Sequence, residues 1–464
     1  MHLRNLKGRA PLKDGYYYAY KTILKNNKWG NFMKRSLSEK ITRAAVGGRL
    51  IKTTWRYIIQ KWKTFLRYIN PEIWIMNCSR KWICQRTPII ANKIFFQTFQ
   101  GDYTCNPKYI TEALLKKNKN LDIVWSLRES SLINCETLPP QVRVVEQFSL
   151  EYFKEIASAK IWVVNSVEFL KKEIIKKPDQ ILFETWHGSL GIKRFSKDVN
   201  AGKAWVKAAE KCGKWTNYCI SNSTFEDNVY RGTFWPDSEI LRYGHPRNDI
   251  LISVDKDKLF EIREKLWEIF NIPMDNKLIL YAPTFRDDHQ FKCYNVNAPQ
   301  LLKAVKEKFG GEWTFLTRYH PTVRKWAQKR GHAFFQETVD VTTYDDIQEL
   351  IAVTDIAITD YSSWIYDFVL TGRPGFIYAT DIEKYYSERG FYYPLNSTPF
   401  PVVINNSELI KAVKDFNMES YSEKVHSFLA DKGCMEDGNA SIRVADKIVE
   451  VINSLPNETL YNKE

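Results

Sequence analysis

From residue 93 onward, short runs of apolar and β-branched residues alternate with stretches in which apolar residues recur at helical spacing. The short runs are typical of buried strands and lie at residues 93–98, 122–127, 142–145, 160–165, 181–185, 218–221 and 239–242. Between them, residues 107–117 and 150–157 have the helical pattern. Strands that alternate with helices predict a parallel sheet with helices on both faces.

A second series of the same kind follows Gly244-His245-Pro246. Its strands are predicted at residues 277–281, 313–317, 355–359 and 375–378, with helices around 255–269, 299–309, 345–353 and 363–371. The expected fold is therefore α/β, with two doubly wound, Rossmann-like domains at residues 91–244 and 245–464 that face a cleft. Helices predicted at roughly residues 405–455 could cross back onto the first domain.

Length and composition agree with two large domains. The chain has 464 residues, more than one hydrophobic core normally supports, and 44% hydrophobic with 26% charged residues exclude a mostly disordered protein. No apolar run reaches the roughly 18–20 residues of a membrane-spanning helix, and the N-terminus lacks a secretory pattern, so we expect the protein to stay in the cytosol. The eight cysteines form no C-x-x-C pair, which indicates neither a zinc site nor a disulfide framework.

The positive charge is concentrated at the N-terminus. Residues 1–86 hold 20 Lys and Arg against 3 Asp and Glu, a net charge of +17, whereas the remainder has a net charge of −3. Within this segment an apolar stripe at helical spacing is interleaved with cations: Trp55, Ile58, Ile59, Trp62, Phe65, Leu66 and Ile69 with Lys52, Arg56, Lys63 and Arg67. We expect residues 1–90 to form a basic amphipathic helical segment that lies on an anionic membrane surface, peripheral to its cytoplasmic side. Packing of the stripe on the protein's own core is the alternative, and nucleic-acid contact lacks a supporting motif.

Polar clusters follow four of the predicted strands, where the carboxyl ends of parallel strands would bring them to one cleft. They are Trp186-His187-Gly188-Ser189 with Lys193 and Arg194, Thr284-Phe285-Arg286-Asp287, Arg318-Tyr319-His320-Pro321, and Asp360-Tyr361-Ser362-Ser363 with Asp367. The last cluster opens a helix, whose N-terminus favours phosphate, although Ser and Asp are also common helix caps.

These residue types suit the transfer of a phosphate-bearing group. His187 could be a general base, because its ordinary pKa near 6.5 suits proton acceptance, or it could be a hydrogen-bonded structural histidine. Arg318 and His320 could contact phosphate or belong to a rigid turn. Arg286 could clamp a phosphate oxygen or pair with Asp287 at the surface. No Asp-x-Asp marks a metal–diphosphate site, so no metal or other cofactor is predicted, and cationic side chains would carry the phosphate charge.

Taken together, the motifs resemble the CDP-glycerol glycerophosphotransferase family of teichoic acid and capsule synthesis. The resemblance rests on Phe99-Gln100-Gly101, Asn106-Pro107-Lys108, Thr185-Trp186-His187-Gly188-Ser189, Gly244-His245-Pro246-Arg247-Asn248-Asp249, Tyr281-Ala282-Pro283-Thr284-Phe285-Arg286-Asp287, Arg318-Tyr319-His320-Pro321, Thr359-Asp360-Tyr361-Ser362-Ser363, Asp367-Phe368, Arg373-Pro374 and Gly390-Phe391-Tyr392. It covers about four-fifths of the chain. The order and spacing of the motifs make it specific.

The resemblance implies a GT-B architecture and the transfer of a polyol phosphate, most simply glycerol phosphate, from a CDP-alcohol to a hydroxyl of a lipid-linked acceptor, with release of CMP. It implies His187 and His320 as catalytic residues, with His187 as the base. It implies that Arg286, Arg318, His320, Ser362 and Ser363, with Asp360, hold the donor phosphates, and that Asp367 lies near the polyol. Ser189, Lys193, Arg247, Asp249 and Thr284 are further candidates from the same motifs.

One departure concerns the loop after His187, where the family usually has Pro-Leu-Lys-Lys and this chain has Leu190-Gly191-Ile192-Lys193. A reshaped loop bears on the acceptor and on the choice of alcohol. CDP-ribitol is therefore the alternative donor, and a GT-B glycosyltransferase that uses a sugar nucleotide is the alternative enzyme. A catalytically silent membrane scaffold would be expected to have lost His187 or His320, and both are present.

Overall fold

The computed structural model describes residues 71–454, except residues 118–119, 132–137, 168–173, 192, 195–202, 254, 287–292, 321–322, 324–336 and 389. The predicted amphipathic helix at residues 55–69 lies outside the described residues, as do Asp287 and Pro321. From Cys78 onward the described residues form one compact unit.

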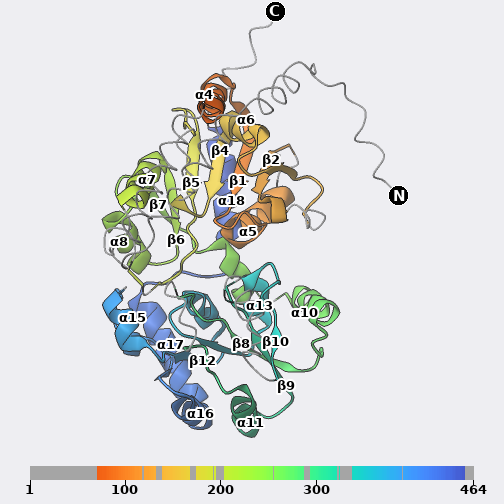
Figure 1. Ribbon diagram of the computed structural model, residues 1–464, viewed down its shortest axis with the longest axis vertical. Helices are drawn as coiled ribbons and strands as arrows, with labels where there is room; N and C mark the ends of the chain where they lie inside the picture. The colour runs from red at the N-terminus through yellow and green to blue at the C-terminus, as the bar shows by residue number, and fades with distance from the viewer. Residues whose placement is uncertain are drawn as a thin grey trace, which may run out of the picture. The chain divides into compact units, whose positions relative to one another are not determined.

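The first half of this unit is built on a seven-stranded sheet (Figure 1). Its strands are β1 (Ile90–Gln97), β2 (Asp122–Leu127), β3 (Arg143–Glu146), β4 (Ala159–Val164), β5 (Ile181–Glu184), β6 (Tyr218–Ser221) and β7 (Glu239–Arg242). All neighbouring strands pair in parallel, in the order β3-β2-β1-β4-β5-β6-β7. The order reverses between β1 and β4, which is the switch point of a doubly wound sheet, where ligands bind beyond the strand ends.

Helices pack on both faces of this sheet. They are α4 (Pro71–Arg86), α5 (Cys105–Lys117), α6 (Leu150–Ser158), α7 (Lys203–Trp215), α8 (Thr224–Gly232) and α18 (Ala440–Asn453). α4 contacts the core through its last turn, because Cys84 is fully buried among residues of α6 and β4, and Arg80 donates to the carbonyl of Phe148. Residues 78–90, which the sequence interpretation places in the basic segment, therefore belong to the unit that contains the sheet.

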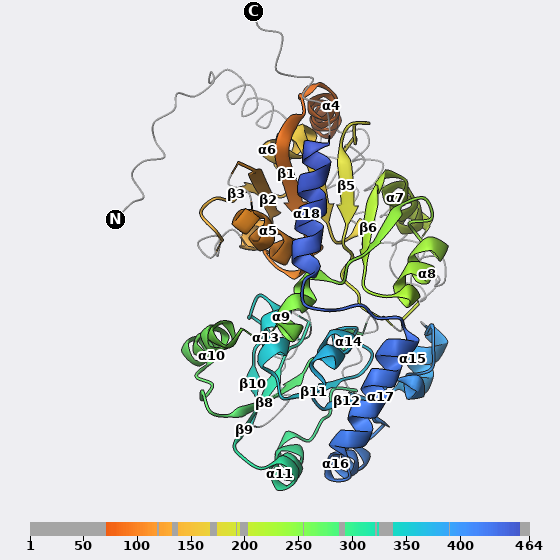
Figure 2. The same cartoon turned by 180° about the vertical axis from the view of Figure 1, so that it is seen from behind.

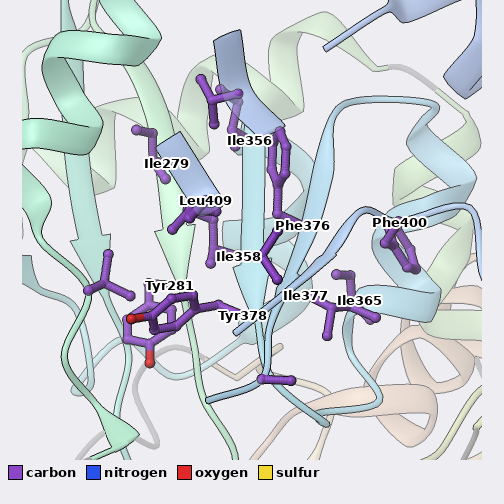
Figure 3. Close-up of a cluster of buried hydrophobic side chains, with 14 of the residues drawn as sticks. Ile279, Tyr281, Ile356, Ile358, Ile365, Phe376, Ile377, Tyr378, Phe400 and Leu409 are labelled. Carbon is purple, nitrogen blue, oxygen red and sulfur yellow. The ribbon is translucent and has the colours of Figure 1, made fainter. Parts of the chain in front are cut away.

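The second half is built on a six-stranded sheet with the order β10-β9-β8-β11-β12-β13. Its strands are β8 (Lys277–Tyr281), β9 (Trp313–Thr317), β10 (Val339–Asp340), β11 (Ile356–Thr359), β12 (Gly375–Tyr378) and β13 (Val402–Val403), all parallel to their neighbours. The switch point lies between β8 and β11. On one face, apolar side chains of β8, β11 and β12 pack against Ile365, Phe400 and Leu409 (Figure 3).

Helices also connect the two sheets and surround the second. The connection contains η4 (Pro246–Asn248), α9 (Asp249–Ile252) and α10 (Lys256–Phe270). The helices that follow are α11 (Ala298–Phe309), α13 (Ile347–Val353), α14 (Ile365–Phe368), η6 (Val369–Thr371), α15 (Ile382–Glu388), η7 (Leu395–Ser397), α16 (Asn406–Lys414) and α17 (Met418–Asp431).

The C-terminal helices divide between the two cores. Leu409 and Val413 of α16 and Phe428 of α17 are buried in the core of the second sheet. In contrast, Val444 and Ile448 of α18 are fully buried in the core of the first sheet, and Figure 2 shows α18 beside α5 and β1. Of the predicted C-terminal helices, only the last crosses back.

The prediction of an α/β fold with parallel sheets is confirmed. Six strands begin and end where the sequence predicts them: β2, β6, β7, β8, β9 and β12. The two-residue edge strands β10 and β13 were not predicted. Among the helices that the structure describes, none is long and apolar enough to cross a membrane.

Candidate active site

A cavity of about 240 Å³ lies beyond the carboxyl ends of β5 and β11. It is lined by the loop after β5, by α8 and by the turn after β11: Trp186, His187, Gly188, Ser189, Gly191, Lys193, Arg194, Phe225, Glu226, Val229, Tyr230, Tyr361 and Ser363. Two of the four predicted polar clusters therefore meet at one cavity. The clusters after β8 and β9 contribute no lining residue within the described part of the chain.

His187 lies at the wall of this cavity with one ring nitrogen held by the backbone. Its Nδ1 is 2.7 Å from the carbonyl oxygen of Asn165, and its ring stacks on Phe99 with the two planes 9° apart. A carbonyl oxygen only accepts, so Nδ1 carries the proton. In the neutral ring, Nε2 is then the nitrogen with a free lone pair.

The surroundings of His187 favour its neutral form. Desolvation is the main cause that lowers its pKa below the usual 6.5, although the residue is exposed at the cavity, and the positive charges of Arg247 and Lys193 act in the same direction. The bond to Asn165 opposes this shift without cancelling it. At neutral pH the ring is an unprotonated base.

Two side chains from other elements hold the backbone around His187. Asn106, at the start of α5, donates from Nδ2 to the carbonyl oxygens of Thr185 (2.9 Å) and Trp186 (3.2 Å). Arg247 donates from Nη2 to the carbonyl oxygen of Gly188, at 2.7 Å. The loop on either side of the imidazole is thus fixed by buried polar side chains.

Arg247 also reaches the second half of the unit. Its guanidinium pairs with Asp367 of α14 through two hydrogen bonds of 3.0 and 3.2 Å, and both side chains are about 95% buried. Gln348 of α13 donates to the same carboxylate at 2.8 Å. Asp367, expected near the donor's polyol, here forms part of a buried pair that connects the His187 loop with the second sheet.

A second buried network lies behind Ser189. Asn222, directly after β6, donates from Nδ2 to Ser189 Oγ (3.1 Å) and to Glu436 (2.9 Å). Glu436 also accepts from the backbone N–H of His245, and burial raises its pKa to about 7. The ring of His245 lies 3.0 Å from Glu226, whose side chain lines the cavity.

On the side of the second sheet, the cavity is bounded by Tyr361 and Ser363. The neighbouring Asp360 is buried and accepts hydrogen bonds from the backbone N–H groups of Thr284 (2.8 Å) and Tyr361 (2.5 Å). Ser362 is half-buried in the same turn. This turn therefore brings backbone and hydroxyl groups to the cavity wall.

Arg286 is buried and fully engaged. Its guanidinium lies 2.8 Å from Asp360 and forms hydrogen bonds of 2.9 and 3.0 Å to Asp381, and it also stacks over Tyr361. The alternative of a surface-exposed Arg286 is wrong, because only 7% of the residue is exposed. Its charge is balanced by two carboxylates next to the turn that holds Ser363.

Arg318 and His320 follow the carboxyl end of β9 in the second sheet. Arg318 donates to the carbonyl oxygens of Val341 and Tyr344, and burial lowers its pKa. The ring of His320 is exposed and lies 4.6 Å from that of Phe285. Neither residue lines the cavity that contains His187.

Two cations from the loop after His187 stand at the cavity. Lys193 pairs with Phe391 in an isolated antiparallel bridge, and Arg194 donates from Nε to the carbonyl oxygen of Phe391 at 3.1 Å. Arg194 is exposed and Lys193 half-buried. They supply positive charge on the side where His187 stands.

Other site residues were either missed or have a different environment from the expected one. Glu226 and Tyr230 of α8 line the cavity although no motif singled them out; the run Ser221-Asn222-Ser223 at the end of β6 was the available signal, because it is polar at a strand's carboxyl end. Asp249 accepts from the backbone N–H groups of Ala440 and Ser441, so it caps α18.

In the described part of the chain, no group of three His, Cys, Asp or Glu side chains could hold a metal ion.

Comparison with known proteins identifies the family. The model described as CDP-glycerol:poly(glycerophosphate) glycerophosphotransferase matches residues 80–450. The chain belongs to this family. The teichoic acid glycerol-phosphate transferase of Staphylococcus aureus (strain NCTC 8325) is 30% identical over 376 residues, which are 77% of this chain and 92% of the relative.

Other members of the glycerophosphotransferase family are longer. The teichoic acid poly(glycerol phosphate) polymerase of Staphylococcus epidermidis (strain RP62A) is 33% identical over 374 residues, which are 76% of this chain and 50% of that polymerase. The chain thus spans about half of that relative's length. A solved structure of the wall teichoic acid polymerase TagF superposes with a TM-score of 0.70 at 29% identity, and covers 85% of this chain and 98% of that one.

Proposed function

We propose that this glycerophosphotransferase-family protein transfers glycerol phosphate from CDP-glycerol to a hydroxyl of a lipid-linked acceptor, with release of CMP, in teichoic acid or capsule synthesis. Relatives that are 33% and 30% identical to this chain are named for glycerol-phosphate transfer, which supports glycerol over ribitol. The observation that carries the proposal is the imidazole of His187, held at Nδ1 by the Asn165 carbonyl, at the wall of a cavity that Ser363 also lines.

In the proposed reaction, Nε2 of His187 accepts the proton of the acceptor hydroxyl. The hydroxyl oxygen attacks the phosphorus that bears the glycerol, and the bond from that phosphorus to the oxygen of CMP breaks. Lys193, Arg194 and the turn at Ser362 and Ser363 supply the charge and hydrogen bonds that stabilise the phosphate oxygens. Such proton acceptance typically contributes about 10²–10⁴ in rate.

The proposal includes a GT-B arrangement, with the acceptor held on the side of the first sheet and the CDP-alcohol on the side of the second. Both sheets have doubly wound strand orders, and in such sheets ligands bind beyond the carboxyl ends of the strands. Arg318 and His320 follow β9 at that end of the second sheet and are proposed to contact the donor's pyrophosphate.

We also propose that residues 1–86 bind the anionic cytoplasmic surface of the membrane, where a lipid-linked acceptor would be found. The net charge of +17 and the aromatic and aliphatic stripe in this segment support the proposal.

A nucleotide-release screen tests the reaction. The purified protein is incubated with a lipid-linked acceptor and, separately, with CDP-glycerol, CDP-ribitol and a set of UDP-sugars, and the released nucleotide and the product mass are measured. We expect CMP from CDP-glycerol and an acceptor heavier by one or more glycerol phosphate units. Release of UDP would contradict the proposal in favour of a glycosyltransferase, and CMP from CDP-ribitol alone would contradict the choice of alcohol.

A further inference from the structure

The residue before His187 has a strained backbone. Trp186 has a φ of 51°, in the left-handed region that bulky residues rarely adopt. Such a conformation persists only where the surrounding structure holds it, and it is typical of functional sites. Because Trp186 directly precedes His187, the geometry of its peptide determines where the imidazole points.

Both backbone polar groups of Trp186 are held by side chains. Its carbonyl oxygen accepts from Asn106, as described above, and its N–H donates to Oε1 of Glu184 at 2.9 Å. Glu184 is the last residue of β5, and its side chain extends past Thr185 to the backbone N–H of Trp186. Asn106 and Glu184 together hold Trp186 from both sides.

Glu184 occupies an unfavourable position for a carboxyl group. It is fully buried, next to Cys219 in the pairing of β5 with β6, and its Oε2 has no hydrogen-bond partner within the described residues. Burial is the main cause that raises its pKa to about 8, so the group is a neutral acid at pH 7. A buried acid with one unpaired oxygen is costly, so packing alone does not account for it.

We propose that Glu184 is a positioning residue for catalysis: its Oε1 holds the strained Trp186 peptide and thereby fixes the His187 ring against the Asn165 carbonyl. Glu184 does not line the cavity, so its carboxyl acts through the loop and not on the substrate. This inference rests on the proposed role of His187 as the base.

The test compares two substitutions at position 184. Glu184→Gln keeps an oxygen that can accept from the Trp186 N–H and has nearly the shape of the protonated acid. Glu184→Leu keeps the volume but removes the acceptor. We expect Glu184→Leu to lower kcat about 10- to 100-fold with the KM for CDP-glycerol unchanged, because small misplacements of a reacting group have effects of this size. Glu184→Gln should retain kcat within about threefold.

A purely structural role predicts another result. Glu155→Leu is the control, because it removes a buried acid on α6 that pairs with Lys93 of β1 and Arg143 of β3, and neither strand neighbours β5 in the sheet order. It should lower the melting temperature and leave kcat unchanged. If Glu184→Leu behaves like this control, or if Glu184→Gln loses as much kcat as Glu184→Leu, the inference is wrong. If Glu184→Leu fails to fold, Glu184→Met, which also lacks the acceptor, has the same expected result.

A second readout does not depend on turnover. The rate at which diethyl pyrocarbonate modifies His187, followed by mass spectrometry, reports the accessibility of its Nε2. We expect several-fold faster or slower modification in Glu184→Leu and the wild-type rate in Glu184→Gln. An unchanged rate in both variants would overturn the inference. Absence of CMP release by the wild-type protein would instead overturn the proposed function, while the modification rates still decide the role of Glu184.

Discussion

At the scale of single residues, the environment of His187 decides what the site can do. The Asn165 carbonyl selects the tautomer, desolvation and the nearby Arg247 and Lys193 keep the ring neutral, and Phe99 restricts its plane. A histidine in this state is unprotonated at neutral pH, so its Nε2 is available to accept a proton.

The lowered pKa of His187 makes a prediction about the pH dependence of the reaction. A base works only when unprotonated, and desolvation with the charges of Arg247 and Lys193 places the pKa of this one below 6.5, so kcat/KM should stay constant above pH 6.5 and decline only in more acidic solution. A pH–rate profile measures the midpoint. His320→Gln is the control, because the pKa of His320 is also lowered and its loss should leave the midpoint in place. A midpoint above 6.5 would contradict the account.

Residue types near strand ends could be predicted from the sequence, but their partners could not. The pattern indicated that His187 and Ser363 follow parallel strands, and both line one cavity. It could not indicate that Arg286 is balanced by Asp381, which follows a different strand far along the chain, because spacing contains no information about which distant charge lies nearby. Nor could it show that α8 forms one wall of the cavity.

At the scale of elements, the strands were predictable where they are long and buried. A two-residue edge strand such as β13 has no periodicity to detect, so its pairing depends on β12 alone. The N-terminus of α18, the helix that packs in the first core, is likewise capped by a residue far away in the sequence. Asp249 accepts from the first backbone N–H groups of this helix, at 2.9 and 2.7 Å.

Removal of this cap should weaken the docking of α18. Asp249→Ala leaves buried N–H groups of the helix without a partner, which costs about 1–3 kcal/mol, and should lower the urea midpoint of unfolding. Asp446→Ala is the matched control on the same helix, because Asp446 is 60% exposed and pairs with Lys117 only at the surface. Equal midpoints for the two variants would show that Asp249 does not act as a cap.

At the scale of the whole molecule, function is proposed to need two parts: the unit that begins at Cys78 and the basic segment before it. Replacement of Lys52, Arg56, Lys63 and Arg67 by Gln should weaken binding to anionic liposomes and its salt dependence, because each cation near such a surface contributes about 1 kcal/mol. The same number of substitutions at the exposed Lys303, Lys308, Lys411 and Lys424 should have little effect. Equal binding by the two variants would contradict a specific role of the basic segment.

The most direct test of the account is His187→Ala with two measurements on the same preparation, CMP release and the affinity for CDP-glycerol. We predict that release falls by at least about 10²-fold while the affinity changes little, since the imidazole accepts a proton and does not hold the donor. His426→Ala, an exposed histidine on α17, should behave like the wild type. Full turnover by His187→Ala at saturating donor would contradict the proposal that this ring is the base.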